Sequence, residues 1–480
     1  MRLLPTHRQP SLTLGTYGPV FWRQGLAVPF TDANCHAHII GKTGSGKSNF
    51  LAWVFLSLVK AGKAVTLIDP HGDLSNLILT RLVTEGFFAS PEAFTKLVYL
   101  DIPKAVRADR FLPFNVLAQP YGDDEVAGFV ANACKRAWPE LAHGAPTFEN
   151  ILKHSIMVLR ANRLPLTALA DLLTDTAYRT RLLSQVADPQ VVRFFTKRMD
   201  AWGREAPKMK ESTLNRADLL TFSRVLRSSL SSSENVLDFR RLIDSNRSCI
   251  INLHLTDDDT RRLFGCLLTV SIEQAALSRA DVPPHQRQNT HHLLIDEFSQ
   301  FTEQSQTSAT RMLSETRKYN LFCWMAHQNW TQTDAQLQGA LQNVGLEVVM
   351  KVGRHDAEYS APILGFSVRP EQIKHTVEDE QAASRSHPTF YSLAEQWEKH
   401  VQALQKLKRG EAWMRLPNDR VVKVMTVPVP TVSVDPDLLA AVEEQYLSTY
   451  FHPAPNQTGE TAVYQAVQPR IRSHPIRCAT

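Results

Sequence analysis

Patterns of buried strands and of a helix alternate near the start of the chain. Short apolar runs at 35–40 and 64–69 predict two buried strands, and residues from Lys47 to Ala61 show the spacing of a helix that ends before Gly62. A strand, a crossover helix and a second strand in this order form one βαβ unit. Ahead of this unit, residues 12–30 have the pattern of short strands interrupted by glycines. Together these patterns predict an α/β domain.

The middle of the chain has a different pattern. Between Asp123 and Arg241 the apolar residues recur at helical spacing, and strand signals are nearly absent. Helix starts are readable at Pro165 and at Pro189. We interpret this part as an all-helical insertion within the α/β domain.

Strand patterns return after the insertion and alternate with helical stretches, the longest of which runs from Asp258 to Arg279. Alternation of strands and helices favours a mainly parallel, doubly wound sheet. A hairpin turned at Pro417-Asn418-Asp419 closes the domain. The expected strands cover residues 249–255, 293–297, 321–326 and 347–352, and the hairpin covers residues 411–427.

These patterns divide the chain into four parts. Residues 1–120 hold the N-terminal strands and the first half of the α/β domain, and residues 121–245 hold the helical insertion. Residues 246–430 hold the second half of the domain with its closing hairpin. Residues 431–480 form a tail rich in proline, with one capped helix from Asp435 to about Tyr450, and we expect its last thirty residues to be poorly ordered.

The composition of the chain excludes only a few classes of protein. The chain of 480 residues is 43% hydrophobic and 21% charged, as in an ordinary globular protein, and its formal net charge is +5. A mildly basic balance is compatible with a polyanionic partner without indicating one. The six cysteines lie far apart with no CxxC pair, which argues against a disulfide framework or a structural zinc site. We expect no membrane span, because the longest apolar run, residues 51–59, is about half as long as one.

A glycine-rich loop with the pattern GxxxxGK[ST] follows the first buried strand. Its glycines let successive backbone N–H groups point at phosphate oxygens, its lysine reaches the β and γ phosphates, and its serine hydroxyl takes one Mg²⁺ position. ATP and Mg²⁺ are therefore the expected ligands. The loop alone fits a kinase and a motor equally well. Its residues are Gly41, Lys42, Thr43, Gly44, Ser45, Gly46, Lys47 and Ser48.

Two adjacent carboxylates, Asp296 and Glu297, end the strand at 293–297. An acid at the carboxyl end of a strand can hold the hydration shell of magnesium, and a neighbouring acid can activate the attacking water. We therefore assign Asp296 to magnesium and Glu297 to the general base. The alternative is an acidic pair that caps the next helix, which the presence of a P-loop disfavours. A small-molecule kinase does not need the second acid, so Glu297 favours hydrolysis.

Three further residues have two interpretations each. Gln328 ends the strand that begins at Leu321, where its side chain can meet the γ-phosphate or the lytic water, or bond the adjacent loop. Arg317, at an expected helix end, fits an arginine finger for a neighbouring subunit or a solvated basic residue. Arg354, after the strand at 347–352, is similarly ambiguous.

Cationic and aromatic residues mix within the insertion. Such a mixture suits a track for the DNA backbone, yet the interleaved Asp200, Glu205 and Glu211 fit a solvated helix face at least as well. The pair His291-His292 has no other ligand-like cluster beside it, so we interpret it as a structural strand start. The mixture consists of Arg193, Lys197, Arg198, Arg204, Lys208, Lys210 and Arg216 with Phe194, Phe195 and Trp202.

Taken together, these motifs resemble the HerA/FtsK class of DNA-pumping ATPases and, within it, the type IV secretion coupling proteins of conjugation, which are TraG/TraD-like. The resemblance spans residues 12–428 in order, and the insertion is similar to the helical domain of these proteins. It rests on His38 to Gly41, Ile68 to Asp73, Ile295 to Phe298, Leu313 to Asn320, Ala326 to Gln328 and Val352 to Ala357.

The resemblance implies a RecA-like P-loop domain in a ring, with a homohexamer as the expected assembly, ATP at subunit interfaces and DNA in a central channel. Arg317 and Arg354 would then reach the adjacent subunit's site, and Asp69 would join the nucleotide-binding residues. A relaxase or a membrane secretion apparatus is the expected partner. Many coupling proteins carry N-terminal membrane helices that this sequence lacks, so we expect a cytoplasmic protein, free or docked at the inner membrane through a partner. HerA-like DNA processing or anti-phage defence with a nuclease, and protein secretion, are the alternatives.

Overall fold

The computed structural model describes residues 10–19, 21–138, 146–302, 306–366, 373–378 and 386–453, so most of the expected disordered tail lies outside the described residues. One sheet of eleven strands forms its centre. In spatial order the strands are β2 (Gln24–Pro29), β1 (Ser11–Tyr17), β14 (Val421–Thr426), β13 (Glu411–Arg415), β10 (Leu346–Val349), β3 (Ala37–Ile40), β9 (Leu321–His327), β8 (His291–Ile295), β4 (Ala64–Asp69), β7 (Ser248–Asn252) and β5 (Leu97–Asp101).

The strands from β10 to β5 in that order run parallel, and the remaining four join them antiparallel. The predicted α/β class with a mainly parallel sheet is therefore confirmed. The closing hairpin is present as β13 and β14, and β1 pairs with β14 through Gly15 and Thr426. Two smaller sheets pair β11 (Ile373–Glu378) with β12 (Ser386–Phe390), and β6 (Arg110–Phe111) with β15 (His452–Pro453).

Helices cover both faces of the sheet, which explains why its parallel strands are apolar at nearly every position. Alternate residues of one strand face opposite layers. Ile39 belongs to the core with α2 (Lys47–Lys60) and α3 (Asp73–Thr84), and Ile40 belongs to the core with α14 (Asp258–Leu277). In the described part of the chain, no helix is both long and apolar enough to cross a membrane. The covering and connecting helices are α1 (Phe30–Ala33), α2 (Lys47–Lys60), α3 (Asp73–Thr84), α4 (Ala93–Lys96), α5 (Ile102–Arg107), α14 (Asp258–Leu277), α15 (Ser299–Thr302), α16 (Gln306–Glu315), α17 (Ala335–Gln342), α18 (Arg354–Ile363), α19 (Leu393–Gln405) and α20 (Pro436–Tyr450).

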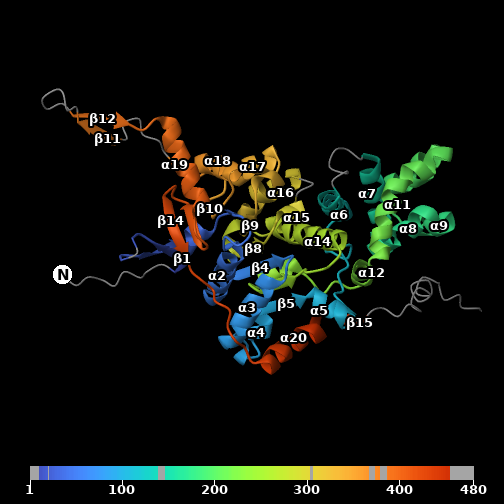
Figure 1. Cartoon of the computed structure of the whole chain (residues 1–480). Coiled ribbons are helices and arrows are strands. Elements are labelled where there is room, and N and C mark those ends of the chain that lie inside the picture. The colour runs from blue at the N-terminus through green and yellow to red at the C-terminus, as the bar shows by residue number, and fades with distance from the viewer. Residues whose placement is uncertain are drawn as a thin grey trace, which may run out of the picture.

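The predicted all-helical insertion lies between β6 and β7, and its described residues contain no strand beyond an isolated bridge at Asn235. The helices α7 (Pro146–Ala161), α8 (Leu169–Thr174), α9 (Thr176–Leu183) and α11 (Ala206–Phe222) stand to one side of the body that holds the sheet (Figure 1). The first helix instead packs on α14 and is tied to it by a buried ion pair between Arg136 and Glu273. Its helices are α6 (Asp123–Ala137), α7 (Pro146–Ala161), α8 (Leu169–Thr174), α9 (Thr176–Leu183), α10 (Pro189–Arg193), α11 (Ala206–Phe222), α12 (Arg224–Leu230) and α13 (Phe239–Asp244).

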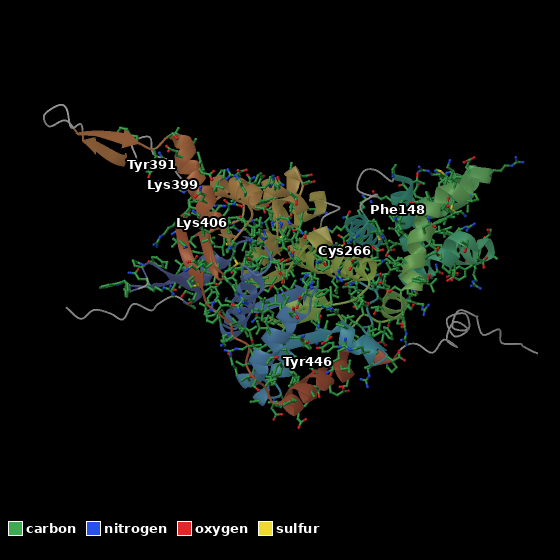
Figure 2. The ribbon with its side chains drawn as sticks, viewed as in Figure 1. Phe148, Cys266, Tyr391, Lys399, Lys406 and Tyr446 are labelled. Carbon is green, nitrogen blue, oxygen red and sulfur yellow. The ribbon has the colours of Figure 1, made fainter. Side chains whose placement is uncertain are left out.

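The capped helix expected near the C-terminus is α20, with the Asp435 side chain accepting from the Asp437 N–H at its start. It lies against the body of the molecule, where Figure 2 labels Tyr446. The Tyr446 hydroxyl donates to the Leu97 carbonyl at 2.7 Å, which fastens α20 to the edge strand β5. The helix is therefore part of the folded body.

Candidate nucleotide-binding site

The glycine-rich loop lies at the carboxyl end of β3 and leads into α2, as its pattern predicts. Gly44 and Gly46 have positive φ of 79° and 113°, a region that glycine enters without strain. A Cβ on Gly41 would lie 2.7 Å from the Ser45 Oγ atom, so the loop is also tightly packed. The Lys47 ammonium, almost fully buried, donates to the Gly41 carbonyl at 2.6 Å. The loop and its lysine are therefore folded together as one small cradle.

The first predicted carboxylate, Asp296, lies beside this cradle at the end of β8. The Ser48 hydroxyl donates to Asp296 Oδ2 at 3.0 Å. Burial, reinforced by the charges of Asp69 and Glu297, raises the Asp296 pKa to about 7. A divalent cation bound there would relieve this crowding of buried carboxylates. The donor set of hydroxyl and carboxylate oxygens fits Mg²⁺, which takes oxygen ligands.

Magnesium in such a site takes few ligands from the protein. Among the described residues there is no group of three or more His, Cys, Asp or Glu side chains arranged to hold a metal. Mg²⁺ bound with nucleotide usually keeps several waters and takes one or two protein ligands plus phosphate oxygens. Ser48 and Asp296 are the residues of this chain that would hold it.

The second carboxylate, Glu297, points toward the same cradle. Its Oε1 atom lies 3.5 Å from Lys47 Nζ and accepts a hydrogen bond from Gln328 Nε2 at 3.1 Å. Its backbone has a positive φ of 47°, which a non-glycine residue adopts rarely and at a cost of about 1–3 kcal/mol. Such strain is concentrated at functional sites, where the surrounding structure enforces one side-chain direction.

Gln328 connects the cradle to this carboxylate. Strand β9 lies between β3 and β8, so the residue after β9 lies between the P-loop and the residue pair after β8. The Gln328 amide donates to Glu297 and accepts from the Thr43 hydroxyl at 3.0 Å. The Gln328 side chain thus lies between the P-loop and Glu297, and its contact with the γ-phosphate or the lytic water stays a prediction.

Asp69 has a different place from the one expected. It is the last residue of β4 and is completely buried. One carboxylate oxygen accepts from the His71 N–H at 3.0 Å and the other from the Ser75 N–H at 2.7 Å. Both oxygens thus hold the start of α3. Direct nucleotide binding by Asp69 stays a prediction, and the geometry favours a supporting role through its charge next to Asp296.

The two predicted arginines lie at opposite edges of the sheet, Arg317 before β9 and Arg354 after β10. Arg317 is exposed and precedes β9, so it lies at the amino edge of the sheet, whereas Gln328 follows the same strand at the carboxyl edge. A strand of this length separates them by roughly 20 Å. Arg354 is exposed at the start of α18, and its guanidinium bonds Glu358 at 2.8 Å and Glu398 at 2.9 Å. Its charge is thus neutralised within the chain.

Three supporting contacts, two at the P-loop and one at Gln328, were not expected from the sequence. The Lys42 N–H donates to the Lys351 carbonyl at 2.9 Å, and the Gly410 N–H donates to the Ser45 carbonyl at 2.9 Å. Gln332 accepts from the Gln328 backbone N–H at 3.2 Å. The first two contacts use backbone atoms of distant segments, and such contacts leave no residue-type signal in a sequence.

The sequence also pointed to His291 and to the cations and aromatic residues of the insertion, and the structure gives their surroundings. His291 is buried and its Nε2 atom lies 2.8 Å from the Thr66 hydroxyl, as expected of a structural strand start. In the insertion, Phe194 and Phe195 are buried in the core and therefore cannot stack on nucleobases. The exposed cations of that mixture are Arg193, Lys197, Arg198, Arg204 and Lys208.

Known proteins share both the sequence pattern and the fold of this chain. The family model described as "Helicase HerA, central domain" matches residues 31–272, a span that holds the P-loop and the helical insertion. The chain belongs to the HerA family. No curated protein sequence matches it significantly.

Solved structures of low sequence identity share the fold of this HerA-family chain. The bacterial conjugative coupling protein TrwB, in an unbound form lacking its N-terminal segment, superposes with a TM-score of 0.58 at 16% identity, over 90% of this chain and 92% of that one. TrwB in complex with the ATP analogue ADPNP superposes with a TM-score of 0.56 at 16% identity, over 89% and 91% of the two chains. VirB4 of Thermoanaerobacter pseudethanolicus superposes with a TM-score of 0.54 at 14% identity, over 90% of this chain and 99% of that one. These likenesses show a RecA-like P-loop fold.

The raised pKa of Asp296 predicts a pH-dependent stability in the absence of nucleotide and magnesium. Because the folded pKa of about 7 exceeds the reference value of 3.8, the folded state binds the proton more tightly, and its stability falls as pH rises from about 4 to 7. Asp296→Asn removes the ionisation. We therefore expect this variant to be more stable than wild type at pH 8, by a few kcal/mol, and much closer to it at pH 5. Urea unfolding at both pH values measures the difference, and an equal difference at pH 5 and pH 8 would contradict the assignment.

Proposed function

We propose that this HerA-family protein hydrolyses ATP with the residues gathered at the carboxyl edge of its sheet. The observation that carries the proposal is the chain of contacts from Thr43 through Gln328 to Glu297, beside the Ser48–Asp296 hydrogen bond. A P-loop alone binds nucleotide. A carboxylate held toward the cradle by an amide also provides a base for water.

Each residue has a distinct task in the proposed reaction. The backbone N–H groups of the P-loop and Lys47 bind the phosphates, and Ser48 with Asp296 hold Mg²⁺, which neutralises phosphate charge when bound. Glu297 accepts the proton of the attacking water. Gln328 keeps the Glu297 carboxylate in place and offers its amide to the water or the γ-phosphate. The strained backbone of Glu297 fits this task, because it fixes the direction of the carboxylate.

We further propose that the active form is a ring, with a homohexamer as the expected assembly. Arg317 supports this, since its exposed position at the amino edge keeps it away from the P-loop of its own chain. An arginine finger provided by a neighbouring subunit would complete the charge stabilisation that phosphoryl transfer needs. Arg354 is less suited to that task because it is already paired with Glu358 and Glu398.

The proposed cargo is DNA, in conjugative or related type IV secretion transfer, with a relaxase or a membrane secretion apparatus as partner. The likeness to TrwB, which is described as a conjugative coupling protein, supports this choice. The exposed cations of the insertion provide charge for contacts with a phosphate backbone. DNA processing with a nuclease partner is the second candidate, and the match to the HerA helicase central domain favours it.

One experiment tests the ATPase and the cargo together. ATP hydrolysis is measured without DNA, with single-stranded DNA and with double-stranded DNA, while light scattering measures the particle mass with and without nucleotide. We expect several-fold stimulation by one form of DNA and a mass near six subunits when nucleotide is bound. Hydrolysis that neither DNA stimulates would contradict DNA as cargo and favour protein secretion. Absence of hydrolysis under all conditions would contradict the proposed activity. The strand preference and the direction of movement follow from the same assay with tailed substrates.

A further inference from the structure

Three buried polar side chains form a hydrogen-bonded row across neighbouring strands directly beneath the P-loop. Glu347 of β10 lies beside His38 of β3, and His327 ends β9. The His38 Nδ1 atom lies 2.7 Å from Glu347 Oε1, and its Nε2 atom lies 2.6 Å from His327 Nε2. All three side chains are 0% exposed. The row therefore joins three adjacent strands through side chains, in addition to their backbone ladder.

The acidic residue of the row, Glu347, determines where the protons of the two histidines lie. A distance of 2.7 Å is typical of a charge-assisted hydrogen bond, so we assign Glu347 as a carboxylate that accepts from His38 Nδ1–H. The bare Nε2 of His38 then accepts from His327 Nε2–H. Burial lowers the pKa of His327 well below its ordinary value, which fits a neutral ring. The two links are thus chemically different, one to an anion and one between neutral rings.

The row ends at the residue that precedes Gln328. The His327 carbonyl accepts from the Gly41 N–H at 3.3 Å, so the end of β9 contacts the first residue of the P-loop through its backbone as well. The Gln328 side chain then reaches Thr43 on one side and Glu297 on the other. A shift of β9 against β3 would displace Gln328 from both partners. The link between His38 and His327 opposes that shift.

We propose that the Glu347–His38–His327 row positions Gln328, and through it Glu297, against the P-loop for hydrolysis. The inference rests on the proposed ATPase activity. These three are positioning residues, because their described side-chain hydrogen bonds run among themselves.

Stability alone does not account for such a row. A buried charge is costly to desolvate, and well-packed apolar residues of similar volume are often as stable or more so. The surroundings are suited to apolar packing, since the rings of Trp330 and Phe298 lie 4.8 Å from His38 and 5.1 Å from His327. Beyond packing, the row provides a fixed, directional link between β3 and β9 next to Gln328.

Two substitutions of His38 separate positioning from stability. An asparagine amide lies near the former Nδ1 position, so His38→Asn keeps the bond to Glu347 and loses the link to His327. A glutamine amide lies near the former Nε2 position, so His38→Gln keeps the link to His327 and leaves the buried Glu347 without its donor. Loss of a partner for a buried charge costs more stability than loss of a bond between neutral groups.

The expected results are therefore opposite for the two variants. His38→Asn should lower kcat about tenfold or more with KM within about twofold, and keep most of its resistance to urea. His38→Gln should be the more easily unfolded variant, yet keep kcat within about threefold of wild type when hydrolysis is measured per nucleotide-binding site. The same logic applies at the other ring, where His327→Asn breaks the link and His327→Gln keeps it. That second pair gives the answer if a His38 variant does not fold.

The matched control is His291→Asn, at the amino edge of the sheet. It removes the bond of an equally buried histidine to Thr66 and should lower stability without changing kcat. Equal kcat for the asparagine and glutamine variants, or a loss of kcat in the control as large as in His38→Asn, would overturn the positioning role. ATP hydrolysis by wild type and by Lys47→Ala is measured in parallel, and Lys47→Ala should abolish it. If wild type does not hydrolyse ATP, the proposed activity itself fails. If wild type hydrolyses ATP but His38→Asn and His38→Gln have the same kcat, only the positioning role fails.

Discussion

Glu297→Gln is expected to bind ATP nearly as well as wild type and to hydrolyse it at least about 100-fold more slowly, the range lost with a general base. The amide cannot accept a proton from water, whereas the shape of the side chain is retained. Its oxygen can still accept from Gln328 Nε2, which in wild type donates to Glu297 at 3.1 Å. The cradle should therefore stay assembled. Fluorescent nucleotide titration measures binding, and phosphate release measures turnover.

The control for this variant is Glu85→Gln, which removes an exposed carboxylate paired with Lys60 and Arg81. It should leave turnover unchanged. Should Glu297→Gln turn over within about threefold of wild type, another group must activate the water and the base assignment is wrong. Loss of nucleotide binding would instead show that the carboxylate holds the cradle together through Lys47, which lies 3.5 Å away.

Arg317→Ala is expected to lower hydrolysis about 10³-fold, as loss of an arginine finger does, with each subunit still able to bind nucleotide. The reason is geometric: Arg317 lies at the amino edge of the sheet, on the side opposite to its own P-loop. Its target would be the site of the adjacent subunit. Mixing Arg317→Ala with Glu297→Gln subunits should therefore restore part of the activity, because some interfaces then pair an intact Glu297 with an intact Arg317.

Lys318→Ala is the matched control, since Lys318 is the next residue in the chain, is equally exposed and carries the same charge. It should hydrolyse ATP at close to the wild-type rate. Normal hydrolysis by Arg317→Ala would exclude the finger. A loss that mixing does not restore would point to a role of Arg317 within its own chain, where it lies close enough to contribute to the lowered pKa of His36.

Much of the site was predictable because its strongest signals are local. The P-loop needs glycines at fixed spacing for positive φ, and Gly44 and Gly46 adopt it. The Asp296-Glu297 pair was recognisable as two acids at the end of an apolar strand. Both signals depend on neighbouring residues only, so a single sequence is enough to find them.

The roles of Gln328, Asp69 and Arg354 were not decided by such signals. Each lies at or after the end of a strand and carries a polar side chain that suits a loop contact equally well. The strand order β3, β9, β8 gives Gln328 its two partners in the site. The backbone N–H groups of His71 and Ser75 donate to the two oxygens of Asp69, and Glu398 of α19 accepts from the guanidinium of Arg354.

By itself the sequence determined the α/β class, the helical insertion and the phosphate cradle, because hydrophobic periodicity and glycine spacing are properties of short segments. The tertiary structure decided which strands lie side by side, and hence that Gln328 meets Thr43 and Glu297 and that Glu347, His38 and His327 form one row. The row joins residues 309 and 289 positions apart in the chain. No local pattern encodes such distances, since they depend on the order in which parallel strands pack into one sheet.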